Sequence, residues 1–318
     1  FYLCIFQERK SDDMTLHLPS VLRRCLCIIT LLIFLFAALP PFSTVAALDT
    51  TPKVYTPSAS GKKVVGNSKA KIDISNVDQG YLMVRYNGNS KKVKLQITKK
   101  GSTTYTYNLS SGSYEAFPLS EGSGTYTVNV YENVSGNQYS LACGESVKVE
   151  IKNSLTPFLY SNQYVKFNAN SKTVAMGAQI AAGAQNQLQV VDRIYDYVVS
   201  NISYDYQKAK TVTSGYLPNV DTILQSKKGI CFDYAAVMAT MLRTQGIPTK
   251  LVVGYAGSAY HAWVSVYINE IGWIDNIFYF DGKSWVRMDP TFASSGNSSA
   301  SIMKYIGDGK NYKAMYAY

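Results

Sequence analysis

The sequence predicts an α+β domain preceded by an all-β, immunoglobulin-like sandwich. Apolar residues alternate at period two between residues 61 and 152, a pattern typical of strands with one buried face. From residue 185 onward the apolar spacing becomes helical, and a run of strands follows. The chain has 318 residues, of which 47% are hydrophobic and 16% are charged, so it can bury the cores of two domains.

An apolar segment near the start of the sequence has the features of a secretory signal. Arg23 and Arg24 precede the apolar run "CLCIITLLIFLFAAL" at 25–39, and small residues ending in "STVAALD" follow. Secretory signals place a basic region, an apolar region and a small-residue cleavage site in this order. The run is shorter than the roughly 20 residues that a membrane-spanning helix needs. An uncleaved membrane anchor is the alternative interpretation.

The expected cleavage point is after Ala47, because Val45 and Ala47 fit the small-residue positions of a signal cleavage site. The predicted signal region is therefore 1–47, and Met14 is a candidate true start because residues 1–13 are polar and contain no Met. We expect a secreted or cell-surface protein with no stable membrane span after cleavage.

The all-β domain is predicted at 61–152, after a linker at 48–60 that is rich in Pro, Ser and Thr. Asn-Gly, Ser-Gly and Gly-Ser pairs separate several of its alternating stretches, as turns between strands do. The Cys…Trp…Cys pattern of antibody domains is missing, so only the architecture is predicted. The domain would bind a cell-wall polymer or hold the next domain away from a surface. The expected strands are 69–75, 80–86, 91–100, 103–109, 124–133 and 145–151.

The α+β domain is predicted at 153–318, with its core at 185–295. Helices are expected at 187–202 and 219–228, and a third helix begins at Cys231 and ends before Gly246 and Pro248. In the first helix the apolar positions at helical spacing are Val190, Val191, Ile194, Tyr197 and Val198. In the third helix Cys231 shares one apolar stripe with Ala235, Met238, Ala239 and Leu242.

Strands are expected after the third helix. The stretch "TKLVVGYA" at 249–256 reads as a buried strand, and "HAWVSVYI" at 261–268 alternates, with His261, Trp263 and Ser265 on one face. A hairpin-like insertion at 268–282 precedes the short strand "SWVRMDPTF" at 284–292. A short helix and a Tyr-rich terminal strand are expected within 296–318. One helix followed by an antiparallel meander is an α+β arrangement.

Charge and cysteine content limit the classes of function. The net charge is +10, but the lysines are scattered or paired and no nucleic-acid-binding motif is present, so nucleic acid is not an expected partner. Three of the five cysteines precede the expected cleavage point, which leaves Cys143 and Cys231. Two cysteines do not make a disulfide scaffold, and two cysteines with one histidine do not make a metal site. A reactive thiol is favoured over a Cys143–Cys231 disulfide or two buried thiols.

Cys231, His261 and Asp289 are the candidate catalytic residues. Cys231 begins a predicted helix, where the helix dipole and a neighbouring imidazolium are expected to lower the pKa of a thiol. His261 would accept the thiol proton, and Asp289 would orient the imidazole. Asp275 and Asp281 are rivals for the third position. Asp289 is preferred because a strand precedes it and Pro290 restricts the backbone there.

Three ordered motifs carry a family resemblance. "GICFDYAAVMATMLRTQGIPTKLVVGY", "HAWVSVY" and "WVRMDPT" resemble the core motifs of the transglutaminase-like superfamily, over about a third of the chain. The resemblance implies a papain-like α+β core with a Cys231–His261–Asp289 triad. No cofactor is expected, because no phosphate-binding Gly-rich loop stands out and the cysteines and histidine do not make a metal site. Tyr204 matches a tyrosine that this family often places before the cysteine motif, and Gln225 has the spacing that papain-like proteases use. Both are candidate oxyanion donors, with a core tyrosine and a solvated helix residue as the alternatives.

The expected function is thiol-dependent acyl transfer from an amide bond of an extracellular protein or peptide. A thioester on Cys231 would be resolved by water in a peptidase or amidase, which is the preferred interpretation. An amine acceptor would make the protein a cross-linking transglutaminase. The further alternative is a non-catalytic binding module of the cell surface, in which the sandwich carries the function.

Overall fold

The computed structural model describes residues 46–256, 258–280, 285–287 and 312–318. Residues 46–318 form one compact unit. The predicted signal at 1–47 lies outside the described residues, except for its last two positions. Within the described ranges, the helices are too short or too polar to cross a membrane.

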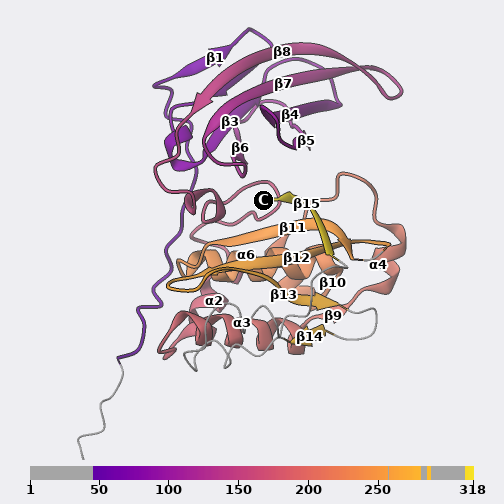
Figure 1. Ribbon diagram of the computed structural model, residues 1–318. Helices are drawn as coiled ribbons and strands as arrows, with labels where there is room; N and C mark the ends of the chain where they lie inside the picture. The colour runs from indigo at the N-terminus through magenta and orange to yellow at the C-terminus, as the bar shows by residue number, and fades with distance from the viewer. Residues whose placement is uncertain (1–45, 257, 281–284, 288–311) are drawn as a thin grey trace, which may run out of the picture. The chain divides into compact units, whose positions relative to one another are not determined.

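Eight strands between residues 64 and 149 form two antiparallel sheets of four strands each (Figure 1). One sheet has the order β1-β2-β3-β6 and the other the order β5-β4-β7-β8. The 3-10 helix η1 (Val77–Gln79) precedes β3. The strands are β1 (Val64–Gly66), β2 (Ala70–Asp73), β3 (Tyr81–Tyr86), β4 (Val93–Lys99), β5 (Thr104–Asn108), β6 (Glu115–Pro118), β7 (Gly124–Ser135) and β8 (Gln138–Val149).

Alternation explains why these residues form sheets. In β5, Tyr105 and Tyr107 are buried while Thr104, Thr106 and Asn108 are exposed, so one face of the strand points into the core. The apolar residues of β4 alternate in the same way. The prediction of period-two strands is confirmed here, whereas the immunoglobulin-like assignment and the domain boundaries remain predictions.

Two short strands and half of a long one escaped the sequence pattern. β1 and β6 have three and four residues, too few for alternation to stand out. The strand expected at 145–151 is the second half of β8, which begins at Gln138. Register shifts between β7 and β8 interrupt the alternation, and Leu141 is 58% exposed in the first half of β8.

The rest of the compact unit combines helices with an antiparallel sheet, as the α+β prediction required. The sheet has the order β14-β13-β12-β11-β15. A small parallel pair joins β9 to β10, and η2 (Thr156–Phe158) precedes the helices. The elements are α2 (Lys172–Ala181), α3 (Gln187–Asn201), β9 (Ser203–Tyr204), α4 (Tyr206–Thr211), α5 (Val220–Ser226), β10 (Lys228–Gly229), α6 (Cys231–Thr244), β11 (Thr249–Ala256), β12 (Ala259–Ile268), β13 (Gly272–Phe280), β14 (Trp285–Arg287) and β15 (Tyr312–Ala317).

Helix α6 is buried on every side rather than along one apolar stripe. Every residue from 233 to 244 is buried, because the helices α2, α3 and α5 and the strands β11 and β12 all pack against α6. Helix α2 was not predicted from the sequence. This helix comes close to α6 at Gly177, where a Cβ atom would lie 3.0 Å from the Cβ of Met241. In α3, Tyr195 takes the buried position expected for Tyr197.

A buried guanidinium joins α6 to the sheet. Arg243 is fully buried and donates from Nε and Nη2 to the carbonyl of Thr249, at 2.9 and 2.8 Å. It also donates to the carbonyls of Tyr160 and Tyr318, at 2.7 and 2.6 Å. Burial lowers the pKa of Arg243 to about 9, so the side chain stays charged at neutral pH.

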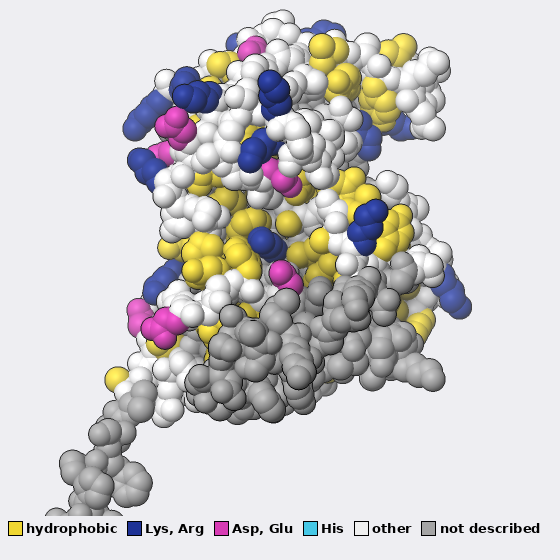
Figure 2. Space-filling model, in the orientation of Figure 1, with side chains coloured by type: hydrophobic (Ala, Val, Ile, Leu, Met, Phe, Trp, Pro, Cys, Tyr) yellow, Lys and Arg dark blue, Asp and Glu magenta, His cyan; other side chains and the backbone are white. Residues whose placement is uncertain are grey.

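The sheet departs from the predicted meander at the expected insertion. The stretch expected as an inserted hairpin is mostly one strand, β13, which pairs with β12. Of the strand predicted at 284–292, only β14 falls within the described residues. The predicted Tyr-rich terminal strand is present as β15, which pairs with β11. Figure 2 shows Lys and Arg side chains dispersed over the described face, as their scatter along the sequence indicated.

Candidate active site

The candidate nucleophile occupies the first position of α6. Ile230 has the extended backbone of an N-cap residue, and its N–H donates to the carboxylate of Asp233 at 2.9 Å. Gly229 is required just before this cap, because a Cβ there would lie 2.6 Å from the Cβ of Asp233. The close approach of Gly229 and the Asp233 cap therefore determine where the helix begins and where the Cys231 thiol lies.

The candidate base lies on the central strand of the sheet. His261 is on β12, opposite Gly254 of β11, and its side chain is 8% exposed. Its Nε2 atom is buried and has no hydrogen-bond partner among the described residues. A buried ring nitrogen without a partner is available to a neighbouring thiol or to a substrate.

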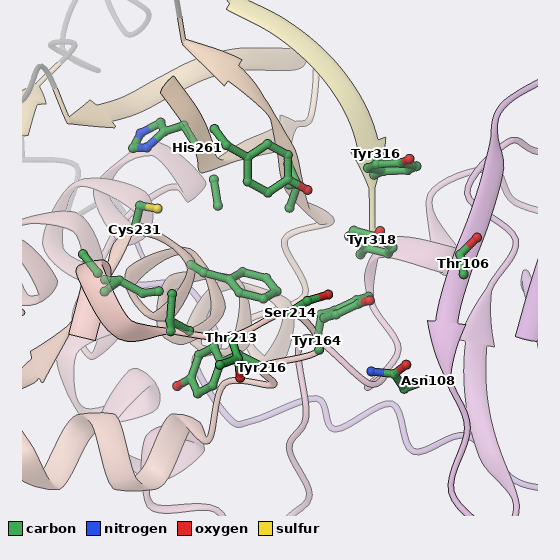
Figure 3. Close-up of a pocket in the computed structure, with 18 of the residues that line it drawn as sticks. Thr106, Asn108, Tyr164, Thr213, Ser214, Tyr216, Cys231, His261, Tyr316 and Tyr318 are labelled. Atoms are coloured by element: carbon green, nitrogen blue, oxygen red, sulfur yellow. The ribbon is translucent and has the colours of Figure 1, made fainter. Parts of the chain in front are cut away.

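Cys231 and His261 line the same cavity, whose volume is about 600 Å³. Figure 3 shows the sulfur of Cys231 on the side of its helix that faces the imidazole of His261. The backbone N–H of Ala262, the residue after His261, is among the groups that act to lower the pKa of the Cys231 thiol. The structure thus brings together two residues that the sequence separates by a whole helix and strand.

Burial keeps both groups neutral in the free protein. Burial raises the pKa of the Cys231 thiol, against the lowering effect of hydrogen bonds from Ala262 and Phe232. The charge of Asp233 raises this pKa further. Burial also lowers the pKa of His261 to about 4. The expectation that the helix start would lower the thiol pKa is wrong for the free protein, because desolvation outweighs the helix amides.

A charged network supports the start of α6 and escaped the sequence analysis. Asp233 is fully buried, and Lys208 on α4 donates to its Oδ2 at 2.6 Å. The hydroxyl of Tyr216 donates to Oδ1 at 2.6 Å and accepts from Lys208 at 2.6 Å. The network ties the segment 206–216 to the catalytic helix. The available signal was Asp233 itself, an acid at the third helix position with a capping role.

The other predicted site residues have different positions. Tyr204 lines the cavity, and burial raises its pKa to about 12. Gln225 is exposed on α5 and is not among the described residues that line the cavity, so the structure does not bring it to the site. Asp275 is exposed on β13, where its charge acts on Lys250. Asp289 and its rival Asp281 lie outside the described residues.

The alternative of a disulfide is excluded. Cys143 and Cys231 are both free thiols, and Cys143 lies on β8, buried beside the carbonyl of Ala70. In the described parts of the chain, His, Cys, Asp and Glu side chains form no group of three that could hold a metal ion.

Comparison with known proteins identifies the segment that carries this site. Residues 174–290 match the family model of the transglutaminase-like superfamily, and in the structure this segment combines helices with strands. The matched segment includes all three candidate catalytic residues.

Individual relatives are distant. The chain is 24% identical to the uncharacterized protein YebA of Bacillus subtilis over 149 residues, which are 40% of this chain and 20% of that protein. It is 26% identical to a protein-glutamine gamma-glutamyltransferase of Pseudomonas aeruginosa over 130 residues, which are 36% of this chain and 19% of that enzyme. The structure of red sea bream transglutaminase aligns over 66% of this chain and 48% of its own, with 14% identity and a TM-score of 0.27. The chain therefore spans about a fifth of these two curated relatives.

Proposed function

We propose that the transglutaminase-like domain of this chain, residues 174–290, catalyses acyl transfer from a protein or peptide amide through a thioester on Cys231. One observation carries the proposal. Cys231 at the start of α6 and His261 on β12 line one cavity. A thiol and an imidazole in contact with one substrate-sized cavity are the parts that covalent catalysis on a carbonyl requires.

In the first step the Sγ atom of Cys231 attacks the carbonyl carbon of the amide. His261 accepts the thiol proton on its imidazole ring and passes it to the leaving nitrogen. A C–S bond forms, the C–N bond breaks, and ammonia or an amine leaves. Burial raises the pKa of the thiol and lowers that of the imidazole, which favours a general-base mechanism over a preformed thiolate–imidazolium pair.

The negative charge that develops on the carbonyl oxygen needs hydrogen-bond donors. The backbone N–H groups of Cys231 and Phe232 lie at the thiol, in the first helical turn, where they have no helical acceptor. The hydroxyl of Tyr204 is a second candidate donor, because it lines the cavity and its raised pKa keeps it protonated.

In the second step an acceptor attacks the thioester carbonyl, and His261 removes its proton and returns a proton to sulfur. Water as the acceptor yields a carboxylic acid, and this peptidase or amidase activity is our first choice. An amine as the acceptor yields a cross-link. The similarity to a protein-glutamine gamma-glutamyltransferase favours this second candidate. Asp289 is proposed to orient the imidazole in either case.

We place the reaction outside the cell, where the predicted signal at 1–47 would direct the chain. The substrate is then an extracellular protein or peptide. The sandwich region would contribute to binding of that substrate or of a cell-wall polymer. A non-catalytic cell-surface module is the competing interpretation, and it predicts that Cys231 can be removed without loss of function.

The test combines two acceptors with a set of thiol variants. The purified protein is given a glutamine-containing peptide with water alone and with a labelled primary amine, and both products are measured. Cys231→Ala and His261→Ala should each lower turnover by at least a thousandfold. Cys143→Ser, which changes the buried thiol far from the cavity, should leave turnover unchanged. Equal turnover by Cys231→Ala would refute the mechanism, and amine incorporation in preference to hydrolysis would refute the choice of water.

A further inference from the structure

We infer that the exposed face of β4 and β5 forms the far wall of the substrate cleft, and that Lys94 on this wall selects a polypeptide with an acidic side chain. The inference rests on the proposed function and names its substrate class. The cavity that holds Cys231 and His261 is also lined by Lys94, Thr106 and Asn108. Figure 3 shows Thr106 and Asn108 on the strand that faces the catalytic residues across the cavity.

The strand register places these polar side chains on one face. Lys94 is opposite Asn108 in the β4–β5 ladder, two residues along from the pair Gln96–Thr106. Residues at this spacing point to the same side of a sheet, and the neighbouring side chains of β4 and β5 point into the core. The ammonium of Lys94 donates to Oδ1 of Asn108 at 2.5 Å.

Asn108 holds this wall close to the catalytic half of the cleft. A Cβ atom on Gly215, whose φ is +88°, would lie 2.3 Å from Nδ2 of Asn108, so the loop at 212–216 approaches the strand as closely as glycine permits. The carbonyl of Asn108 accepts a hydrogen bond from Gln163 at 2.8 Å. The lysine is therefore presented at a defined position rather than on a free loop.

Charge complementarity identifies the group that Lys94 would bind. Among the described residues that line the cavity, Lys94 is the one side chain charged at neutral pH, and none is acidic. Its partner Asn108 is neutral, so the positive charge is not compensated within the cleft. Lys208 on α4, next to the lining residue Ala209, is paired with Asp233. A carboxylate of the substrate would be the counterion of Lys94.

The floor between Lys94 and Cys231 favours a polypeptide over an anionic sugar or phosphate polymer. Aromatic rings line it in contact with each other, with centroids of Tyr164 and Tyr318 4.3 Å apart and those of Tyr164 and Phe232 5.5 Å apart. Such rings bury apolar side chains well. The expected substrate segment therefore has an acidic residue at one end, apolar or aromatic residues in the middle, and the reacting amide at Cys231.

The test measures equilibrium binding to Cys231→Ala protein, so that it needs no turnover. The ligands are fluorescent peptides with a central glutamine and flanking apolar residues. At each flanking position in turn, a peptide with Glu is compared with the matched peptide that has Gln there. Glu should bind roughly three- to tenfold more tightly than Gln at one position or at two neighbouring positions. Lys94→Met should abolish that preference, and Lys94→Glu should invert it. Lys91→Met, an equal charge change at an exposed residue outside the cavity, should preserve it.

Three outcomes would overturn the inference. These are an equal affinity for Glu and Gln at every position, a Glu preference that survives Lys94→Met, and poly(glycerol phosphate) binding tighter than every peptide through Lys94. When Cys231 is intact, Lys94→Met should raise KM for the acidic peptide and leave kcat unchanged. Absence of turnover together with Lys94-dependent peptide binding would refute the catalytic proposal while leaving the acidic subsite intact.

Discussion

At the scale of single residues, desolvation is the main cause of the pKa shifts of Cys231 and His261. A helix start usually favours a thiolate, yet burial raises the pKa of this thiol, and burial lowers the pKa of the imidazole. Both shifts favour the uncharged pair. The free protein therefore resembles a serine-type pair of neutral nucleophile and neutral base more than a thiolate–imidazolium ion pair.

The buried imidazole makes the stability of the protein depend on pH. Because the pKa of His261 falls from 6.5 to about 4 on folding, the unfolded chain binds more protons between these values. The contribution of the buried neutral His261 to the free energy of unfolding should therefore be fully present above pH 6.5. It should decrease as the pH falls toward 4. The expected loss is roughly 2 kcal/mol at pH 4.5.

Urea unfolding at pH 7.5 and pH 4.5 measures this loss. His261→Asn removes the titrating group, so the difference between the two pH values should shrink by about the same 2 kcal/mol. Carboxylates whose pKa is lowered on folding, such as Asp73 and Glu132, contribute equally to both proteins and cancel. An unchanged pH dependence in the variant would contradict the buried neutral state of His261.

At the scale of elements, α6 depends on α4 and the loop that follows it. The carboxylate of Asp233 is fully buried and relies on Lys208, on Tyr216 and on the N–H of Ile230. Removal of one partner of a buried ion pair leaves an uncompensated charge, which costs more than an exposed pair contributes. The same segment, 212–216, lines the cavity, so damage to this network should reach the site.

Lys208→Met should therefore lower the free energy of unfolding by about 2 kcal/mol, a value reduced because the lysine is partly exposed. Tyr216→Phe should cost about 1 kcal/mol. Lys210→Met, on an exposed position of the same helix, is the matched control and should be neutral. Denaturant unfolding measures all three. A cost for Lys208→Met no larger than that for Lys210→Met would show that the ion pair does not stabilise the helix start.

At the scale of the whole molecule, Arg243 connects elements that are remote in sequence. Its four hydrogen bonds reach three carbonyl groups, those of Tyr160 before α2, Thr249 at the start of β11 and Tyr318 after β15. Tyr318 in turn packs against Tyr105 and Tyr107 of β5, with centroids 5.6 and 5.9 Å apart. The guanidinium thus secures the strand that joins the catalytic sheet to the β4–β5 wall.

Arg243→Met should destabilise the protein by on the order of 3 kcal/mol, because buried carbonyls lose their donor. Arg243→Lys should recover little, since an ammonium lacks the planar fork that reaches all three groups. Arg193→Met, at an arginine that donates to the carbonyl of Ala182 near the surface, should cost less than half as much. Thermal and urea unfolding provide the comparison, and equal losses for the two arginines would refute this role of Arg243.

Part of the fold was predictable because it depends on neighbours in the sequence. The limits predicted for β11 match the structure, and α3, α5 and α6 lie where their spacing and caps placed them. Helix α2 was missed because two of the three buried positions at helical spacing, Val174, Gly177 and Ala181, are small residues that give a weak apolar signal. β8 was half missed because register shifts break its alternation.

By itself the sequence determined that Cys231 begins a helix and that His261 lies on a strand after it, because caps, glycines and apolar periods act within a few residues. Only the tertiary structure decided that the two line one cavity, that both are desolvated, and that Gln225 lies elsewhere. It alone revealed the Lys208–Asp233 pair and the Lys94 wall. Such contacts join segments far apart in the chain, so neither spacing nor periodicity encodes them, and burial depends on all of the elements packed together.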